Sequence, residues 1–347
     1  MSVCRYRSCL SFCLLVLWFL CGVKLFAQSS SDYDRGVAAF RAGDYSSAAA
    51  LFARVEAAAP GKTDAALYRA KCLVHIPDFA GAEQGLRSYL DAHPDSSDAL
   101  YMLGFALNRE NRPSESLAIY TKAAAISQPS SDDLKIVGLD YVLLGDYPDA
   151  IKWLEKSVAF DNKNKDAWYY LGRAYYTRSR LTEARRAFLV ALKLDPRDAR
   201  AENGLGLIFE SSAQPEQAIQ AYKDAISWDR ENPHKSEQPY VNLGSLLLEQ
   251  GRTKEALKPL EIAVQLAPAS GYCHLRLGAG YFREGQMENA LSELSKATEL
   301  DPANASAHYQ LGRVYKQMHQ LDRAKAEFEK AVNLQNKAAS SAARETH

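Results

Sequence analysis

A repeat of 34 residues, as from Gly138 to Gly172 (172 − 138 = 34), recurs along almost the whole chain. It constrains the possible folds of this chain more than any other feature of the sequence. With Lys165 taken as position 1 of a repeat, positions 8 and 20 are small and position 24 is bulky in nine successive copies. Position 8 holds Gly36, Ala70, Gly104, Gly138, Gly172, Gly206, Gly244, Gly278 and Gly312. Position 20 holds Ala48, Ala82, Ser116, Ala150, Ala184, Ala218, Ala256, Ala290 and Ala324. Position 24 holds Phe52, Leu86, Tyr120, Leu154, Phe188, Tyr222, Leu260, Leu294 and Phe328. The spacing between successive copies is constant except between Gly206 and Gly244 (244 − 206 = 38). Three separate positions thus recur with the same spacing, which indicates a repeat architecture.

One copy, residues 166–196, shows what each repeat forms. Apolar residues recur at spacings of three and four in two segments, which predicts amphipathic helices over residues 167–177 and 182–194. Neither helix can bury its apolar stripe alone, so the pair is expected to stack on neighbouring pairs. Left-handed residues are expected to end the first helix at position 15, which carries Gly43, Gly145, Gly251 and Gly285.

The same copy carries a motif that resembles a known family. Trp168, Leu171, Gly172 and Tyr175, followed by Ala184, Phe188 and Pro196, are similar to the tetratricopeptide repeat (TPR) pattern. The resemblance implies an all-α fold, a right-handed superhelical solenoid of about nine TPR helix-turn-helix repeats. The array is expected over residues 29–338, with repeats that start at 29, 63, 97, 131, 165, 199, 237, 271 and 305. A polar C-terminal tail, residues 339–347, is expected to follow it.

Residues 1–28 have the composition of an export signal. Arg5 and Arg7 precede an apolar run over residues 10–23, and small Ala27 lies where a signal peptidase would cut. The run is shorter than the ~20 residues that a membrane-spanning helix needs. We therefore expect an exported protein, periplasmic or secreted, with a soluble mature chain; the alternative is an uncleaved membrane anchor over residues 10–23.

The positions of the cysteines argue against a disulfide framework, and the charge balance argues against a nucleic-acid partner. Four of the six cysteines lie in the signal, and Cys72 and Cys273 fall in repeats two and eight, too far apart in a solenoid to pair. The whole chain has 42 basic and 42 acidic residues. Without the signal's Arg5, Arg7 and Lys24 the balance is 42 − 3 = 39 against 42, a net charge of −3. This balance gives no reason to expect nucleic acid as a partner.

The sequence contains no recognisable catalytic constellation, so we expect neither enzymatic activity nor a cofactor. Residues 60–63 resemble the end of a phosphate-binding loop, but Glu56 stands where that loop needs glycine. His274 and His308 share position 4 of neighbouring repeats, yet a metal site needs three or more convergent ligands. The expectation for both histidines is packing, with a metal or small-molecule site, or an enzyme, as the weaker alternative.

The TPR resemblance also implies where a partner would bind. In that family the first helices line the concave face, around positions 2, 5, 9, 12 and 13. Positions 5, 9, 12 and 13 here carry eight Lys or Arg residues against two acidic ones, Glu210 and Glu249. The expected peptide-binding groove contains Tyr33, Phe40, Arg41, Lys71, Tyr101, Phe105, Arg109, Tyr169, Arg173, Tyr176, Phe282, Arg283 and Arg313. Basic and aromatic residues in a groove suit an acidic or C-terminal peptide, because cations meet carboxylates and rings take apolar side chains. The competing interpretation is that these aromatics only extend the core between helices.

These features together predict a non-enzymatic protein-protein interaction scaffold of the cell envelope. The alternative is a substrate-recruiting or assembly subunit of a separate envelope enzyme or of a secretion or pilus machine. Self-association through the exposed end of the C-terminal repeat is a further alternative, because no separate capping helix follows repeat nine in the sequence.

Overall fold

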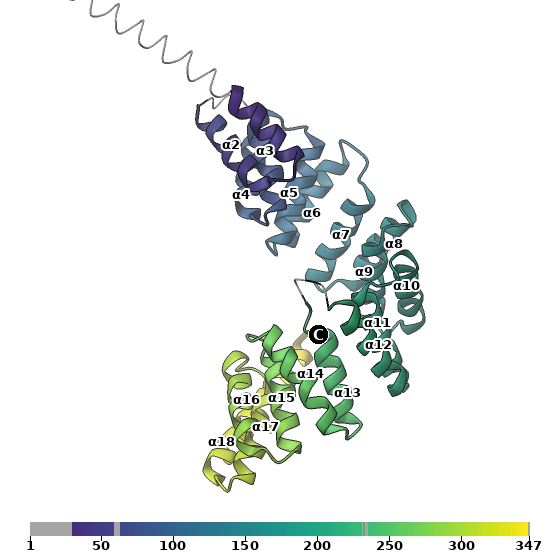
Figure 1. Ribbon diagram of the computed structural model, residues 1–347, viewed down its shortest axis with the longest axis vertical. Helices are drawn as coiled ribbons and strands as arrows, with labels where there is room; N and C mark the ends of the chain where they lie inside the picture. The colour runs from purple at the N-terminus through teal and green to yellow at the C-terminus, as the bar shows by residue number, and fades with distance from the viewer. Residues whose placement is uncertain (1–29, 59–62, 231, 233–234, 346–347) are drawn as a thin grey trace, which may run out of the picture. The chain divides into compact units, whose positions relative to one another are not determined.

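The computed structural model describes residues 30–58, 63–230, 232 and 235–345, and every regular element in these residues is a helix (Figure 1). The expected signal, residues 1–28, lies outside them. The first helices of the hairpins are residues 30–41, α3 Thr63–His75, α5 Ser97–Arg109, α7 Ser131–Leu143, α9 Lys165–Thr177, α11 Ala199–Ser211, α13 Gln238–Glu249, α15 Gly271–Arg283 and α17 Ala305–Gln317. The second helices are α2 Tyr45–Ala58, α4 Phe79–Ala92, α6 Pro113–Ala124, α8 Tyr147–Phe160, α10 Leu181–Leu194, α12 Pro215–Trp228, α14 Thr253–Leu266, α16 Met287–Leu300 and α18 Leu321–Glu345.

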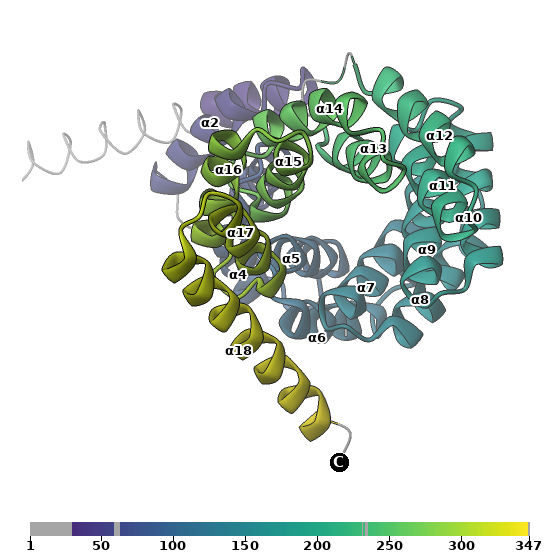
Figure 2. The ribbon, with the colours of Figure 1, turned by 90° about the horizontal axis from the view of Figure 1, so that it is seen from below.

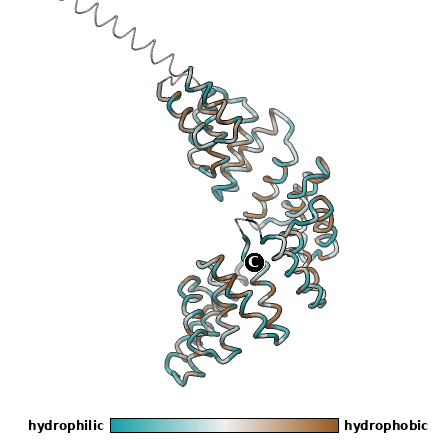
Figure 3. The backbone as a smooth tube through the Cα atoms, in the orientation of Figure 1, coloured by the Kyte–Doolittle hydropathy of each residue, from teal (hydrophilic) through white to brown (hydrophobic). Residues whose placement is uncertain are grey.

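The described chain divides into two compact units at Ala174 and Tyr175, within α9. In the first unit α5 packs against α6 of its own hairpin and against α4 of the preceding one. In the second unit α17 packs in the same way against α18 and α16. Each helix pair therefore contacts its neighbours in sequence, which is the packing of a TPR solenoid and confirms the predicted all-α fold class. Hydrophobic and hydrophilic residues alternate along the helices of both units (Figure 3), as stacking on one face requires.

The small and bulky columns of the sequence meet inside each hairpin. A Cβ added to Gly104 would lie 2.6 Å from the ring of Tyr120, and one added to Gly138 would lie 2.7 Å from Leu154. The position-24 side chain thus occupies the space that position 8 leaves empty. The next first helix then covers it: Leu294 shares a core cluster with Ala307, Leu311 and Val314 of α17. The periodic pattern of the sequence is therefore the pattern of the core.

Position 15 is left-handed in all nine repeats, including the five where it is not glycine. Gly43, Gly145, Gly251 and Gly285 have φ between 74° and 79°, as predicted. The remaining five are Pro77, Asn111, Ser179, Ala213 and His319, with φ between 26° and 60°. Left-handed backbone costs a residue with a Cβ roughly 1–2 kcal/mol. The tight turn between the two helices is therefore set by the architecture, and glycine only makes it easier.

A second periodic device caps the first helices at their N-termini. Position 34 of a repeat carries a short polar side chain that accepts a hydrogen bond from the backbone of the following helix, at Ser96, Ser130, Asn164, Asp198, Ser270 and Asn304. Such a cap contributes about 1 kcal/mol to a helix. These caps were not predicted from the sequence. The recurrence of serine, asparagine and aspartate at position 34 is the sequence signal that would have indicated them.

Three further features bear on the sequence predictions. α18 runs on to Glu345, so residues 339–345 of the expected tail continue the last helix (Figure 2). Cys72 and Cys273 are free, buried thiols, and burial raises the pKa of Cys72 to about 11. In the part of the chain that is described, every helix is too short or too polar to cross a bilayer.

Candidate peptide-binding site

The predicted groove residues lie on the first helices, which form one face of each unit. Neighbouring first helices contact each other, as α5 does with α7 and α13 with α15, and the face that they form in each unit is called the inner face here. The first unit carries Tyr33, Phe40, Arg41, Lys71, Tyr101, Phe105, Arg109, Tyr169 and Arg173. The second unit carries Tyr176, Phe282, Arg283 and Arg313.

The N-terminal aromatic residues of the predicted set pack largely within the protein. The Tyr33 ring lies 5.7 Å from that of Phe52 and 6.1 Å from that of Tyr68, edge to face. Phe40 makes a similar contact with Tyr68 at 5.7 Å. Both side chains are half-buried against the core of the first two repeats. Here the rings extend the core between helices, as the competing interpretation states, while their remaining surface stays accessible.

Tyr101 and Phe105 of α5 also join neighbouring repeats. The Tyr101 hydroxyl donates a hydrogen bond of 2.7 Å to the Ser127 carbonyl, and its ring lies 5.8 Å from that of Tyr120. The Phe105 ring lies 6.0 Å from that of Phe79. These contacts fix both rings in place, so neither needs to become ordered when a partner arrives.

Three cations of first helices in the first unit lie over aromatic rings; Tyr68 and Tyr169 are also on first helices, and Phe79 begins the second helix α4. Lys71 Nζ lies 5.5 Å from the centre of the Tyr68 ring, and the Arg109 guanidinium lies 5.4 Å from that of Phe79. Arg173 lies 5.9 Å from the centre of the Tyr169 ring. At these distances a cation is attracted to the ring face.

Two of these cations, Lys71 and Arg109, lack a carboxylate partner among the described residues. Lys135 differs, since its Nζ lies 2.6 Å from Asp132 Oδ1 and that charge is neutralised. Among the described residues the charges of Lys71 and Arg109 are therefore not offset by a carboxylate, and the predicted Arg41 is exposed on its first helix.

The inner face of the second unit combines one such cation with polar groups. Arg313 lies 4.6 Å from the centre of the Phe282 ring, and Arg283 donates a hydrogen bond to the Leu248 carbonyl. The Tyr176 hydroxyl is 3.3 Å from Ser211 Oγ. Of the predicted residues in this unit, Phe282 and Arg313 are brought together, and Arg283 and Tyr176 bind other partners.

Polar contacts between the helices of this unit were not predicted from the sequence. Asn242 Nδ2 donates a hydrogen bond of 3.0 Å to Asn203 Oδ1. Arg276 donates to Ser245 Oγ at 2.7 Å and pairs with Glu249 at 3.2 Å. Because Arg276 offsets one of the two acidic groove residues, the inner face of this unit is polar rather than acidic.

His274 and His308 have equivalent contacts, each with the second helix of its own repeat and with the link from the preceding repeat. His308 Nδ1 lies 2.6 Å from Glu327 Oε2, and its Nε2 lies 3.1 Å from the Pro302 carbonyl. His274 makes the same two contacts, with Glu293 and Pro268, at 2.6 and 3.0 Å. Both rings are buried and tie a first helix to its own second helix and to the preceding link. No group of three or more metal-ligating side chains occurs within the described ranges.

Stacked hairpins whose first helices form one face within each unit define a helical repeat protein of the interaction-scaffold class. Family models for the tetratricopeptide repeat match residues 33–97, 78–131, 138–199 and 183–235, and a second such model matches residues 237–270 and 305–337. A model described as TPR repeat matches residues 278–319. The chain belongs to the tetratricopeptide repeat family.

Relatives and solved structures agree with this assignment. The chain is 25% identical over 284 residues to DnaJ protein P58IPK homolog B of Oryza sativa, covering 73% of this chain and 60% of that protein. It is 32% identical over 101 residues to the type IV pilus assembly protein PilF of Pseudomonas aeruginosa, covering 29% of this chain and 38% of that protein. The chain thus spans less than two thirds of either relative. A tetratricopeptide repeat protein from Parabacteroides merdae superposes with a TM-score of 0.58 at 17% identity, covering 73% of this chain and 98% of that one.

Proposed function

We propose that this protein is a non-enzymatic scaffold that binds an extended, acidic segment of a partner protein along the first-helix face. Tetratricopeptide repeat proteins are protein–protein interaction scaffolds, and that coarser role follows from family membership. The observation that carries the finer proposal is the position of Lys71 and Arg109, stacked on rings without a carboxylate partner in the described structure.

The stacked arrangement suits an acidic peptide for physical reasons. A ring beneath a cation holds it in place without neutralising its charge, so a carboxylate of the partner can still form a charge-assisted hydrogen bond. The accessible surface of the same rings can take the apolar side chains between the carboxylates. Phe282 and Arg313 repeat this arrangement in the second unit.

We propose the cell envelope as the site of action. The composition of residues 1–28 supports export, and the similarity to the Pseudomonas pilus assembly protein supports an envelope role. That similarity also favours the second candidate, an assembly subunit of a pilus or secretion machine or of an envelope enzyme. N-terminal sequencing of the exported chain tests the localisation: a start near Gln28 or Ser29 supports cleavage and export, and an intact Met1 in the cytosolic fraction rejects both.

A peptide-binding measurement tests the groove. Fluorescently labelled short peptides, acidic and matched basic, are titrated with the wild-type chain and with a Lys71→Glu/Arg109→Glu variant. We expect the acidic peptide to bind in preference to the basic one, with affinity at least tenfold lower for the variant.

The matched control is Lys122→Glu/Lys163→Glu, which makes the same change of charge at two exposed residues outside the first helices. Equal losses in the two variants would mean that only net charge matters, and would reject the groove. Self-association through the C-terminal repeat is a separate part of the proposal.

A further inference from the structure

The last hairpin leaves open a face that every earlier hairpin buries. The position-24 side chain is at most 4% exposed in repeats one to eight, for example 1% at Phe188 and 0% at Leu294. In repeat nine Phe328 is only half-buried, and beside it Leu321 is 64% and Val332 53% exposed. In a solenoid this face of a second helix is covered by the first helix of the next repeat, and among the described residues no helix covers this face of α18.

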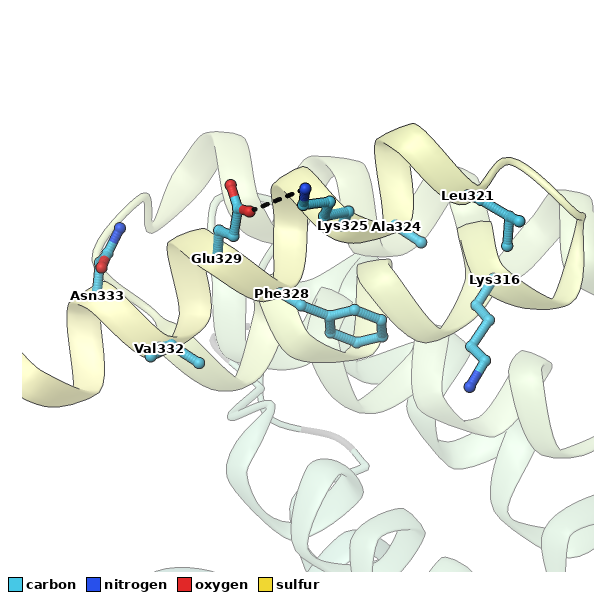
Figure 4. A pocket seen from close by; sticks show the side chains of 8 residues that line it. All are labelled: Lys316, Leu321, Ala324, Lys325, Phe328, Glu329, Val332 and Asn333. Carbon is cyan, nitrogen blue, oxygen red and sulfur yellow. Dashed lines mark ion pairs between the residues drawn. The ribbon is translucent and has the colours of Figure 1, made fainter.

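The open face forms a hollow of about 610 Å³ along α18 (Figure 4). Its apolar lining is Leu321, Ala324, Phe328 and Val332, and its charged lining is Lys316, Lys325 and Glu329. The ammonium of Lys325 lies 3.9 Å from the carboxylate of Glu329, one helical turn further on, and both side chains are exposed. The hollow is thus apolar along its length, and beside Lys316 it carries the pair of opposite charges formed by Lys325 and Glu329.

The shape that fits this face is known from the junctions inside the chain. Leu294 of α16 is covered by Ala307, Leu311 and Val314 of α17, which are spaced by four and three residues on one side of a helix. The occupant of the α18 face is therefore a helix with an apolar stripe of that period. α18 itself presents such a stripe, since Leu321 and Phe328 are seven residues apart and Val332 follows four later.

We propose that the occupant is α18 of a second copy of this chain, packed antiparallel about a two-fold axis between Ala326 and Glu327. In this register Leu321 of each copy faces Val332 of the other. Lys325 lies beside Phe328 and Glu329 of the second copy, so its stem packs on the ring and its charge meets the carboxylate. The same contact thereby covers the hollow of each copy, and Lys325 and Glu329 each meet an opposite charge across the axis.

α18 is longer than the second helices of the earlier repeats, and residues 321–332 are the part that pairs in this register. α18 has 25 residues, against 14 in α16, so the helix continues beyond the point where it leaves its own hairpin (Figure 2). This inference rests on the self-association named under the proposed function and is independent of the peptide groove.

Charge exchange tests the register. The chain without residues 1–28 keeps every described helix, and its association is followed by sedimentation velocity over a range of concentrations. We expect wild type to dimerise, and Lys325→Glu and Glu329→Lys each to weaken the dimer at least tenfold, because each places like charges across the axis. A one-to-one mixture of the two variants, and the Lys325→Glu/Glu329→Lys double variant, are expected to dimerise like wild type.

The contrary results are specific. A wild type that stays monomeric at every concentration overturns the proposal, as does a mixture that fails to associate while the single variants are folded by circular dichroism. Val332→Glu is expected to abolish the dimer, and Leu189→Glu, at a 49% exposed residue of α10, is expected to leave it intact. The Lys71→Glu/Arg109→Glu variant is expected to dimerise normally, so loss of the peptide site and loss of the dimer are separately visible.

Discussion

Gly206 lies directly against Tyr222, so closely that a Cβ on Gly206 would be 2.4 Å from Cε1 of the ring. Tyr222 is fully buried, and its hydroxyl donates a hydrogen bond of 2.6 Å to Glu210, which holds the ring in position. Real Cβ atoms do not approach other heavy atoms so closely. Gly206 is therefore required because the ring of Tyr222 on α12 packs against the backbone of α11 and leaves no room for a side chain.

Gly206→Ala is expected to destabilise the protein. Alanine favours a helix by about 1 kcal/mol over glycine, but overpacking a core costs typically about 1–3 kcal/mol and the buried ring has no free space. The measurement is the urea-unfolding midpoint. Gly85→Ala is the matched control, because a Cβ there would lie 3.4 Å from the Ala66 carbonyl, an ordinary contact. We expect Gly85→Ala to be neutral or stabilising; similar losses in both variants would refute the contact argument.

Ala213→Gly is expected to stabilise the protein by about 1 kcal/mol, because Ala213 has φ 56° at position 15, where a Cβ is strained. Glycine adopts this conformation freely. Gly251→Ala makes the reverse change at the equivalent position, φ 74°, and should lower the thermal midpoint. A lower midpoint for Ala213→Gly would show that loss of unfolded-state restriction outweighs the relief of strain.

Asp140 is expected to make the protein less stable as pH rises. Its carboxylate is fully buried and accepts hydrogen bonds from Asn108 at 2.8 Å and Ser116 at 2.6 Å, and burial raises the pKa of the carboxyl from 3.8 to about 6. Because the folded-state pKa is the higher one, folding favours the protonated form. The associated stability is present below pH ~4 and is lost as pH rises through ~6.

Asp140→Asn keeps the shape and removes the titration. We expect this variant to be more stable than wild type at pH 8, by roughly 2–3 kcal/mol, and to show little advantage at pH 4. Urea unfolding at the two pH values measures the difference. An equal difference at both values would mean that Asp140 does not titrate with folding.

The His308 contacts are expected to stabilise the junction between repeats eight and nine. His308→Phe removes both ring nitrogens, and the buried Glu327 carboxylate and the Pro302 carbonyl lose a partner, at a cost of about 1–3 kcal/mol. A double-mutant cycle with Glu327→Gln isolates the ring–carboxylate pair. We expect the two changes together to cost less than their sum, by roughly 0.5–3 kcal/mol, as for residues in direct contact. Strict additivity would exclude direct coupling.

The fold could be predicted from the sequence because the 34-residue repeat places small and bulky residues at the positions that form the core. The residues at positions 8 and 24 contact each other in the core, so their small and bulky side chains predict that contact from the sequence. The left-handed turns at Gly145 and Gly251 are predictable because glycine favours this conformation. The same turn at Ser179 or Ala213 carries no such signal, since there the architecture imposes a conformation that the residue does not favour.

The site is less accessible to sequence reasoning than the fold. Position numbers place Lys71 and Lys135 alike on first helices, but only the structure shows that Lys71 lies over Tyr68 and that Lys135 pairs with Asp132. The place of His308 at position 4 likewise does not predict its contact with Glu327 of the following helix. Such pairings depend on side-chain rotamers across helices, which the spacing of residues does not determine.

Short-range hydrogen bonds close the loops of this chain. The turn of repeat three is closed by a hydrogen bond from the Arg112 backbone to Leu107, five residues back, and the longer link after α12 by one from the Ser236 backbone to Asp229, seven residues back. Small loops cost little entropy to close, and chains with mainly local contacts fold fast. A chain emerging from the ribosome can therefore acquire its structure hairpin by hairpin from the N-terminal end, without waiting for its last repeats.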